Sequence, residues 1–237
     1  MIEKVSKENA LAQAQSFSDL GLEGWTPEDL VIPQLRIAQP TSQVDITPGR
    51  FYDTLSGESW DEITVVFLKS SWGRVLFHEE LGEGVVCRSM DRVRPSDRIE
   101  NPPAEFCHEC PHSKWIDGNP PKCKEQLINF LLKVNEDFSE VQPYIFTVHG
   151  ANLKPLKTLI SLMVARRQPL YSKVIHMKTN MVVGEKGKYF VVKYTIQGDV
   201  PAEVLSQFRE MSKQYTSSVA EEVLDEGNKD EEGEIEF

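Results

Sequence analysis

The fold class is decided by the stretch of residues 173–196, whose sequence is KVIHMKTNMVVGEKGKYFVVKYTI. Its two segments, 173–179 and 188–196, contain valine, isoleucine, threonine and aromatic residues, which favour the extended backbone of a strand. Gly184 and Gly187 lie between the segments, and glycine suits a tight turn. The stretch therefore predicts a β-hairpin.

The same pattern extends through most of the chain. Short apolar or alternating runs are separated by turn signals such as Pro48-Gly49 and Ser56-Gly57. Many short strands with regular turn signals are typical of a β-sandwich or barrel. We expect strands near residues 30–38, 50–55, 63–69, 74–78, 84–88, 127–134 and 144–148.

Two segments have helical periodicity instead. Residues 155–167 carry one apolar stripe, with Pro155 in the first turn and Pro169 after the end. Residues 201–215 carry a second stripe that includes Leu205 and Phe208. Together with the strands, these segments predict a mainly β, α+β fold.

The 237 residues divide into three parts of different composition. We expect an N-terminal arm or helix at 1–29, one β-rich domain at 30–219, and a disordered acidic tail at 220–237. No run approaches the roughly 18 apolar residues of a membrane span, and residues 1–15 lack the apolar stretch of a secretory signal. The sequence therefore predicts no membrane partner and a reducing compartment, in which thiols bind metal more often than they form disulfides.

The four cysteines lie in or beside a segment that is poor in aliphatic residues. Cys107 and Cys110 form a CxxC pair, and Cys87 and Cys123 lie on either side of it. Tetrahedral Zn(II) bound by these four thiolates leaves no cysteine unused and would order an insertion at about 87–123. The alternatives are four reduced thiols, or a site in which His108 or His112 replaces Cys87.

A catalytic metal is a weaker interpretation. Zinc deaminases combine an H-x-E sequence with P-C-x-x-C, and His78 precedes Cys107 and Cys110 at a suitable distance. Phe106, however, occupies the proline position, and a site with four thiolates has no open position for water. Phosphate-binding loops and hydrolase motifs are also absent from the sequence, so we expect no enzymatic activity.

The net charge of −11 is distributed unevenly. Residues 221–237 contain nine acids and one lysine, whereas residues 149–194 contain nine bases and one acid. The second segment also contains several tyrosine and phenylalanine residues. Lysines near phosphates and aromatic rings stacked on bases are typical of proteins that bind single-stranded nucleic acid. The expected DNA contacts are Lys154, Arg166, Arg167, Lys173, Lys178, Lys186, Lys188, Tyr189 and Phe190.

Tyr189 and Phe190 cannot both face DNA, because neighbouring residues of a strand point to opposite sides. The sequence does not decide between the two faces. A flexible acidic tail tethered to the basic segment would also compete with DNA for it. The residues of that tail expected to bind partners are Asp230, Glu231, Glu232, Glu234, Glu236 and Phe237. Phe237 is an aromatic residue at the end of the tail.

These features together resemble the single-stranded DNA-binding proteins of tailed bacteriophages. The resemblance rests on the acidic tail with its terminal Phe237, on residues 31–40 (VIPQLRIAQP), on Cys87-Arg88-Ser89 with Asp91, and on the remaining cysteines. The cysteines are similar to those of a zinc-containing subgroup. The match covers roughly residues 30–237.

The resemblance implies an OB-fold, a Greek-key barrel, here with a zinc-stabilised insertion and flanking helices. It implies non-catalytic binding of single-stranded DNA in phage replication and recombination, in the cytoplasm of the infected bacterial host. The tail would recruit a polymerase or a helicase-primase, and some relatives are homodimers. The rival interpretations are a zinc-containing regulator that binds a polymerase through acidic surfaces and a zinc enzyme that acts on nucleic acid.

Overall fold

The computed structural model describes residues 21–24, 31–78, 84–185, 187–215, 220 and 224. Most of the expected N-terminal arm, Lys186 and the predicted tail residues 230–237 lie outside these ranges. The described part contains two sheets and two α-helices. The strands are β1 (Leu35–Ile37), β2 (Phe51–Asp53), β3 (Ser59–Trp60), β4 (Glu62–Phe77), β5 (Val85–Ser89), β6 (Lys124–Val134), β7 (Val141–His149), β8 (Lys173–Gly184) and β9 (Gly187–Asp199), and the helices are α2 (Leu153–Ala165) and α3 (Ala202–Gln214).

The larger sheet has the order β7-β6-β4-β8-β9, with β5 paired to the far end of β4. Every one of its pairings is antiparallel. The hairpin expected at 173–196 is present as β8 and β9, and the strands expected at 127–134 and 144–148 as β6 and β7. The two expected helices are also confirmed, with ends within two residues of the prediction. The mainly β, α+β class is therefore correct.

The long strand β4 corrects one expectation. Residues 63–69 and 74–78 were predicted as separate strands, but β4 runs without a break from Glu62 to Phe77. Gly73 does not interrupt it. A Cβ atom there would lie 2.8 Å from the carbonyl oxygen of Ser89 and 2.9 Å from the Ile128 side chain. Gly73 is thus required by the close approach of neighbouring strands.

Strand β4 separates two hydrophobic cores. Val65 and Phe67 belong to a core that also contains Leu156 and Leu159 of α2. Val66 and Leu68 belong to a second core with Phe208 and Met211 of α3, among others. Successive residues of a strand point to opposite faces, so each helix covers one face of the sheet.

Among the described residues, a backbone bridge joins the two sheets on one side only. Gln34, just before β1, forms a parallel bridge with Ile145 of β7. On the other side, the side chain of Gln39 bonds to the backbone of Phe190 in β9, but β1 and β9 share no strand pairing. The described strands therefore form no closed barrel, and the expected OB-type Greek-key barrel is not confirmed.

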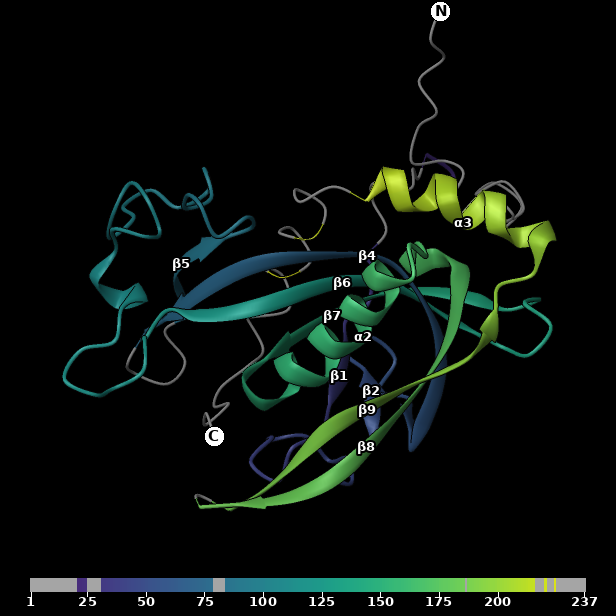
Figure 1. The fold of residues 1–237 in the computed structure, drawn as a ribbon, viewed down its shortest axis with the longest axis horizontal. Coiled ribbons are helices and arrows are strands. Elements are labelled where there is room, and N and C mark those ends of the chain that lie inside the picture. The colour runs from purple at the N-terminus through teal and green to yellow at the C-terminus, as the bar shows by residue number, and fades with distance from the viewer. Residues whose placement is uncertain are drawn as a thin grey trace, which may run out of the picture.

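The segment between β5 and β6 protrudes from the end of the sheet, away from α3 (Figure 1). Its regular structure among the described residues is one 3-10 turn, Pro111–Ser113, and an isolated bridge between Ile116 and Asn119. This segment corresponds to the expected insertion at about 87–123. Because it has almost no secondary structure, another interaction must hold its chain in place.

Candidate metal and nucleic-acid sites

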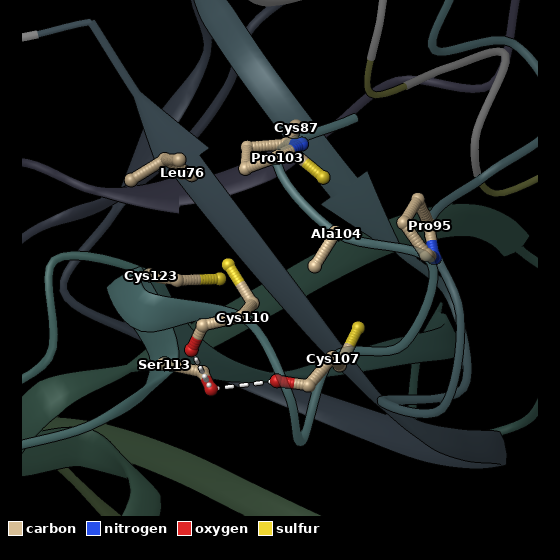
Figure 2. A pocket seen from close by; sticks show the side chains of 9 residues that line it. All are labelled: Leu76, Cys87, Pro95, Pro103, Ala104, Cys107, Cys110, Ser113 and Cys123. Atoms are coloured by element: carbon tan, nitrogen blue, oxygen red, sulfur yellow. Dashed lines mark hydrogen bonds between the residues drawn. The ribbon is translucent and has the colours of Figure 1, made fainter. Parts of the chain in front are cut away.

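The four cysteines meet at one place in the fold. Cys87 lies on β5, Cys107 and Cys110 lie in the protruding segment, and Cys123 directly precedes β6. All four are buried and reduced. Their side chains line one cavity of about 10 Å³, which is closed otherwise by Leu76, Pro95, Pro103, Ala104 and Ser113 (Figure 2). Residues far apart in sequence are thus gathered around a single small space.

Backbone hydrogen bonds fix the loop that carries the CxxC pair. The Cys110 N–H donates to the Phe106 carbonyl at 3.2 Å, and the Cys107 N–H donates to Val93 at 2.9 Å. The Ser113 hydroxyl lies 2.6 Å from the Cys107 carbonyl oxygen and 2.8 Å from that of Cys110 (Figure 2). These contacts hold both thiols toward the cavity without any sheet.

The donor set fits a soft metal ion. The cavity has about the size of one water-sized sphere. Burial raises the pKa of Cys87 and of Cys123 to about 11, so both thiols are neutral at pH 7 unless a cation replaces their protons. Within the described ranges, however, no three His, Cys, Asp or Glu side chains form an assembled metal centre. The fit therefore rests on the four thiols and the size of the cavity.

Neither candidate histidine lines this cavity. The His108 side chain is 73% exposed, and its Nε2 lies 3.6 Å from a carboxylate oxygen of Glu109. His112 contributes its backbone carbonyl, which accepts a hydrogen bond from the Cys123 N–H at 2.8 Å. Neither histidine is among the residues that line the cavity, whereas all four cysteines are.

Four of the predicted DNA contacts are exposed cations. Lys154 lies in the first turn of α2, and Arg166 and Arg167 follow its last turn. Lys188 lies on β9. Arg167 has a φ of 53°, the left-handed conformation that ends the helix. Because α2 packs on the core that β9 also enters, the elements that carry these cations are adjacent in the fold.

Two other predicted contacts are already paired with acids. Lys173 is buried, and its ammonium group bonds to the Asp199 carboxylate opposite it on β9. The exposed Lys178 lies 3.3 Å from Glu62. Lys173 is therefore a structural residue in this fold, whereas Lys178 must exchange one partner for another to bind a phosphate.

The structure distinguishes the two aromatic candidates. A Cβ atom at Gly49 would lie 2.5 Å from the Phe190 ring, so this ring packs directly against the Gly49 backbone. Phe190 faces inward and is not free to stack on a base. Tyr189 points to the opposite face and is half-buried, with its ring beside Gly184.

A groove between α2 and the β8–β9 hairpin was not predicted from the sequence. Its volume is about 800 Å³, and it is lined by Pro155, Thr158, Leu159, Leu162, Arg166, Asn180, Val182 and residues 191–196. Tyr194 is among the lining residues. Its hydroxyl is buried and has no hydrogen-bond partner in the described part of the chain. Burial raises the pKa of this phenol, which therefore remains protonated.

A second cluster missed by the sequence interpretation surrounds Trp72 on β4. The guanidinium carbon of Arg92 lies 4.1 Å from the centre of its ring, and Nζ of Lys157 lies 5.4 Å from it. Both distances are within the range of cation–π attraction. Arg92 belongs to the protruding segment and Lys157 to α2, so Trp72 links the cysteine-containing segment to the basic side of the protein. Nothing in the local sequence pattern indicated this contact.

Comparison with known proteins places the chain in a family. Residues 3–224 match the family described as Pam3 phage gp34-like protein. No curated protein and no solved structure match the sequence. Among the described residues, no helix is long and apolar enough to cross a membrane.

Proposed function

We propose that this chain, which belongs to the Pam3 phage gp34-like family, binds single-stranded DNA without catalysis, in phage replication and recombination. It would act on phage DNA in the cytoplasm of the infected host. The acidic tail would recruit replication proteins and compete with DNA for the basic surface. We define that surface as Lys154, Arg166, Arg167 and Lys188.

The observation that carries this proposal is the position of these cations. All four are exposed, and none has a carboxylate partner among the described residues. They occupy both ends of α2 and the adjacent strand β9 in a protein whose net charge is −11. Unpaired cations on adjacent elements of an acidic protein offer a place for a polyanion. Backbone phosphates neutralised by lysine and arginine supply most sequence-independent affinity.

Zinc would have a structural role in this proposal. The protruding segment has almost no secondary structure, and a metal bound by Cys87, Cys107, Cys110 and Cys123 would hold its chain together. The same segment supplies Arg92 to the Trp72 ring. A metal bound by the four cysteines would therefore also help to hold Arg92 against the Trp72 ring.

We propose further that the two sheets represent an open variant of the OB-type barrel. Two observations support this interpretation: the bridge between Gln34 and Ile145, and the side-chain contacts between Gln39 and Phe190. They bring the small sheet next to both edge strands of the large one. The second contact uses an amide side chain where a closed barrel would use a strand pairing.

The proposal is tested by fluorescence anisotropy with labelled oligo-dT and with a duplex of equal length, at two salt concentrations. We expect preference for the single strand and an affinity that falls steeply with salt. Lys188→Glu and Arg167→Glu should each weaken binding and reduce the salt slope by about 0.7 per lost phosphate contact. Lys114→Glu, which reverses an exposed cation of the protruding segment, is the matched control.

The outcomes separate the proposal from its rivals. Failure of the protein to bind oligo-dT at low salt would exclude DNA binding and favour a regulator that acts through acidic surfaces. A variant lacking residues 225–237, which keeps the buried Leu224 of the second core, should bind more tightly at low salt, because it lacks most of the competing polyanion. Equal affinities of the truncated and complete proteins would contradict that competition.

A further inference from the structure

We propose that the groove between α2 and β9 binds an extended peptide of a partner protein, which adds to the free edge of β9 as a further strand. The peptide we infer has acidic residues alternating with aliphatic ones. This binding site does not include the proposed DNA contacts Lys154, Arg167 and Lys188, and it shares only Arg166 with the basic surface. It would let the protein bind a partner while DNA occupies Lys154, Arg167 and Lys188.

The first step concerns the edge of β9. This strand is the last of the large sheet and pairs only with β8. At its beginning, the outward backbone groups are occupied by two amide side chains. Gln39 bonds to both the N–H and the carbonyl of Phe190, and Asn152 bonds to the Phe190 carbonyl and to the Val192 N–H. These bonds show which residues of β9 direct their backbone outward.

The second step follows from the two-residue repeat of a strand. If Phe190 and Val192 direct their polar backbone groups outward, the next outward groups are the Val192 carbonyl, both groups of Tyr194 and the Ile196 N–H. No described residue bonds to these groups. The edge is therefore capped at Phe190 and at the Val192 N–H, and it is open from the Val192 carbonyl to the Ile196 N–H. An unpaired strand edge is a template for another strand.

The third step is that the open part of the edge lies inside the groove. Residues 191–196 line it along one side, and α2 lines it along the other. Its volume of about 800 Å³ is of the size that holds a ligand. Helix α2 lies beside the edge of β9 and limits the space next to it. The edge can therefore pair with a short strand, whereas α2 hinders pairing with the edge of a large sheet.

The chemistry of the groove indicates which peptide fits. Leu162 on α2 is 38% exposed, and Val182, Val191 and Ile196 are half-buried. The charged residues among the lining are Arg166 and Lys193, with no acid. Side chains of an added strand alternate between two faces. One face of the peptide would meet aliphatic side chains, and the other would offer carboxylates to the two cations.

The groove is less suited to a nucleic acid. Its aromatic residue, Tyr194, packs edge-on against Phe67, with ring centres 6.1 Å apart, and its hydroxyl is buried. No lining ring is free to stack on a base, which is the interaction that sequence-tolerant single-strand binding uses. Open backbone groups, in contrast, match the donors and acceptors of an extended peptide.

The test uses a labelled synthetic peptide in which glutamate alternates with valine, together with two N-methylated forms of it. One form is methylated on the glutamates and the other on the valines. N-methylation removes backbone donors, and a strand directs the donors of alternate residues to the same side. We expect anisotropy measurements to show about a tenfold or greater loss for one form and little change for the other. Absence of binding by the parent peptide, or equal binding by both methylated forms, would overturn the proposal.

Two substitutions locate the site in the full-length protein. Lys193→Glu and Leu162→Glu should each weaken peptide binding by about tenfold or more, with unchanged circular dichroism and melting. Lys188→Glu, on the same strand but outside the groove, should leave peptide binding intact while it weakens oligo-dT binding. If Leu162→Glu weakened oligo-dT binding and left peptide binding unchanged, the groove would belong to DNA and the proposal would be wrong. The two proposals therefore fail in different assays.

Discussion

Asn152 joins the start of α2 to the edge of β9 through Val192. Its Oδ1 accepts a hydrogen bond from the Val192 N–H at 2.7 Å, and its Nδ2 donates to the Phe190 carbonyl at 3.2 Å. Asn152 occupies the N-cap position of α2 but makes no side-chain bond to the helix. Its amide therefore sets the position of the helix relative to the strand.

Replacement of Asn152 by alanine should destabilise the protein by about 1–2 kcal/mol, because two hydrogen bonds to β9 are lost and backbone groups are left unpaired. Urea denaturation measures this change as a lower midpoint with an unchanged slope. Thr158→Ala removes an exposed hydroxyl that bonds within α2 and serves as the control, with an expected change below about 0.5 kcal/mol. Equal stability of Asn152→Ala and the parent protein would show that packing alone positions α2.

Metal content should be close to one zinc ion per chain in protein purified without chelators. Cys107→Ser should lose the metal and destabilise the protruding segment, because that segment lacks other regular structure. His108→Ala and His112→Ala should keep the metal, since neither side chain lines the cavity. Elemental analysis by mass spectrometry measures all four proteins. Loss of zinc in a histidine variant, with retention in Cys107→Ser, would contradict the four-cysteine assignment.

The pair formed by Lys173 and Asp199 predicts opposite effects of two substitutions. Asp199→Asn leaves a buried ammonium group without its counter-charge and should cost about 1 kcal/mol or more. Lys173→Met removes the buried charge and keeps the aliphatic stem, so stability should change little or increase. Thermal melts of both variants test this order. Lys173→Met should also bind oligo-dT like the parent, which distinguishes a structural lysine from a DNA contact.

Tyr194→Phe should raise the stability of the protein by about 1 kcal/mol. The substitution removes a buried hydroxyl that has no partner, and an unsatisfied buried polar group costs about 1–3 kcal/mol. The ring and its edge-on contact with Phe67 are retained. Denaturant titration measures the change. A loss above about 1 kcal/mol would show that this hydroxyl has a bonding partner in solution.

Local patterns predicted most of the strands and both helices. The hairpin of β8 and β9 was found because valine, isoleucine and aromatic residues alternate with polar ones on either side of glycine. The same local signals misplaced the break in β4. Gly73 lies between the two strands predicted there, and the absence of a side chain at this position lets Ser89 and Ile128 approach β4 closely. That role depends on neighbouring strands and is invisible in the segment itself.

The candidate sites divide in the same way. The spacing of the cysteines was sufficient to group them, and the structure brings all four to one cavity. The charge count could not distinguish the exposed Lys188 from the buried Lys173, because the latter depends on Asp199 across the hairpin. The groove beside β9 was not predictable either, since it exists only through the position of α2.

The alternation along β4 also determines where the protein can be engineered. Removal of Val66 would exchange the faces of Phe67 and Leu68, so each of these side chains would point into the core that belongs to the other helix. Such a deletion would disturb both hydrophobic cores at once, and a local rearrangement of side chains could not restore the packing of either core. An affinity tag or fluorophore is better placed at the exposed turn of Asp117 and Gly118, where both residues have positive φ. Neither residue belongs to a hydrophobic core, so an insertion there would not change core packing. Insertions and deletions within this part of β4 should therefore be avoided when the protein is engineered.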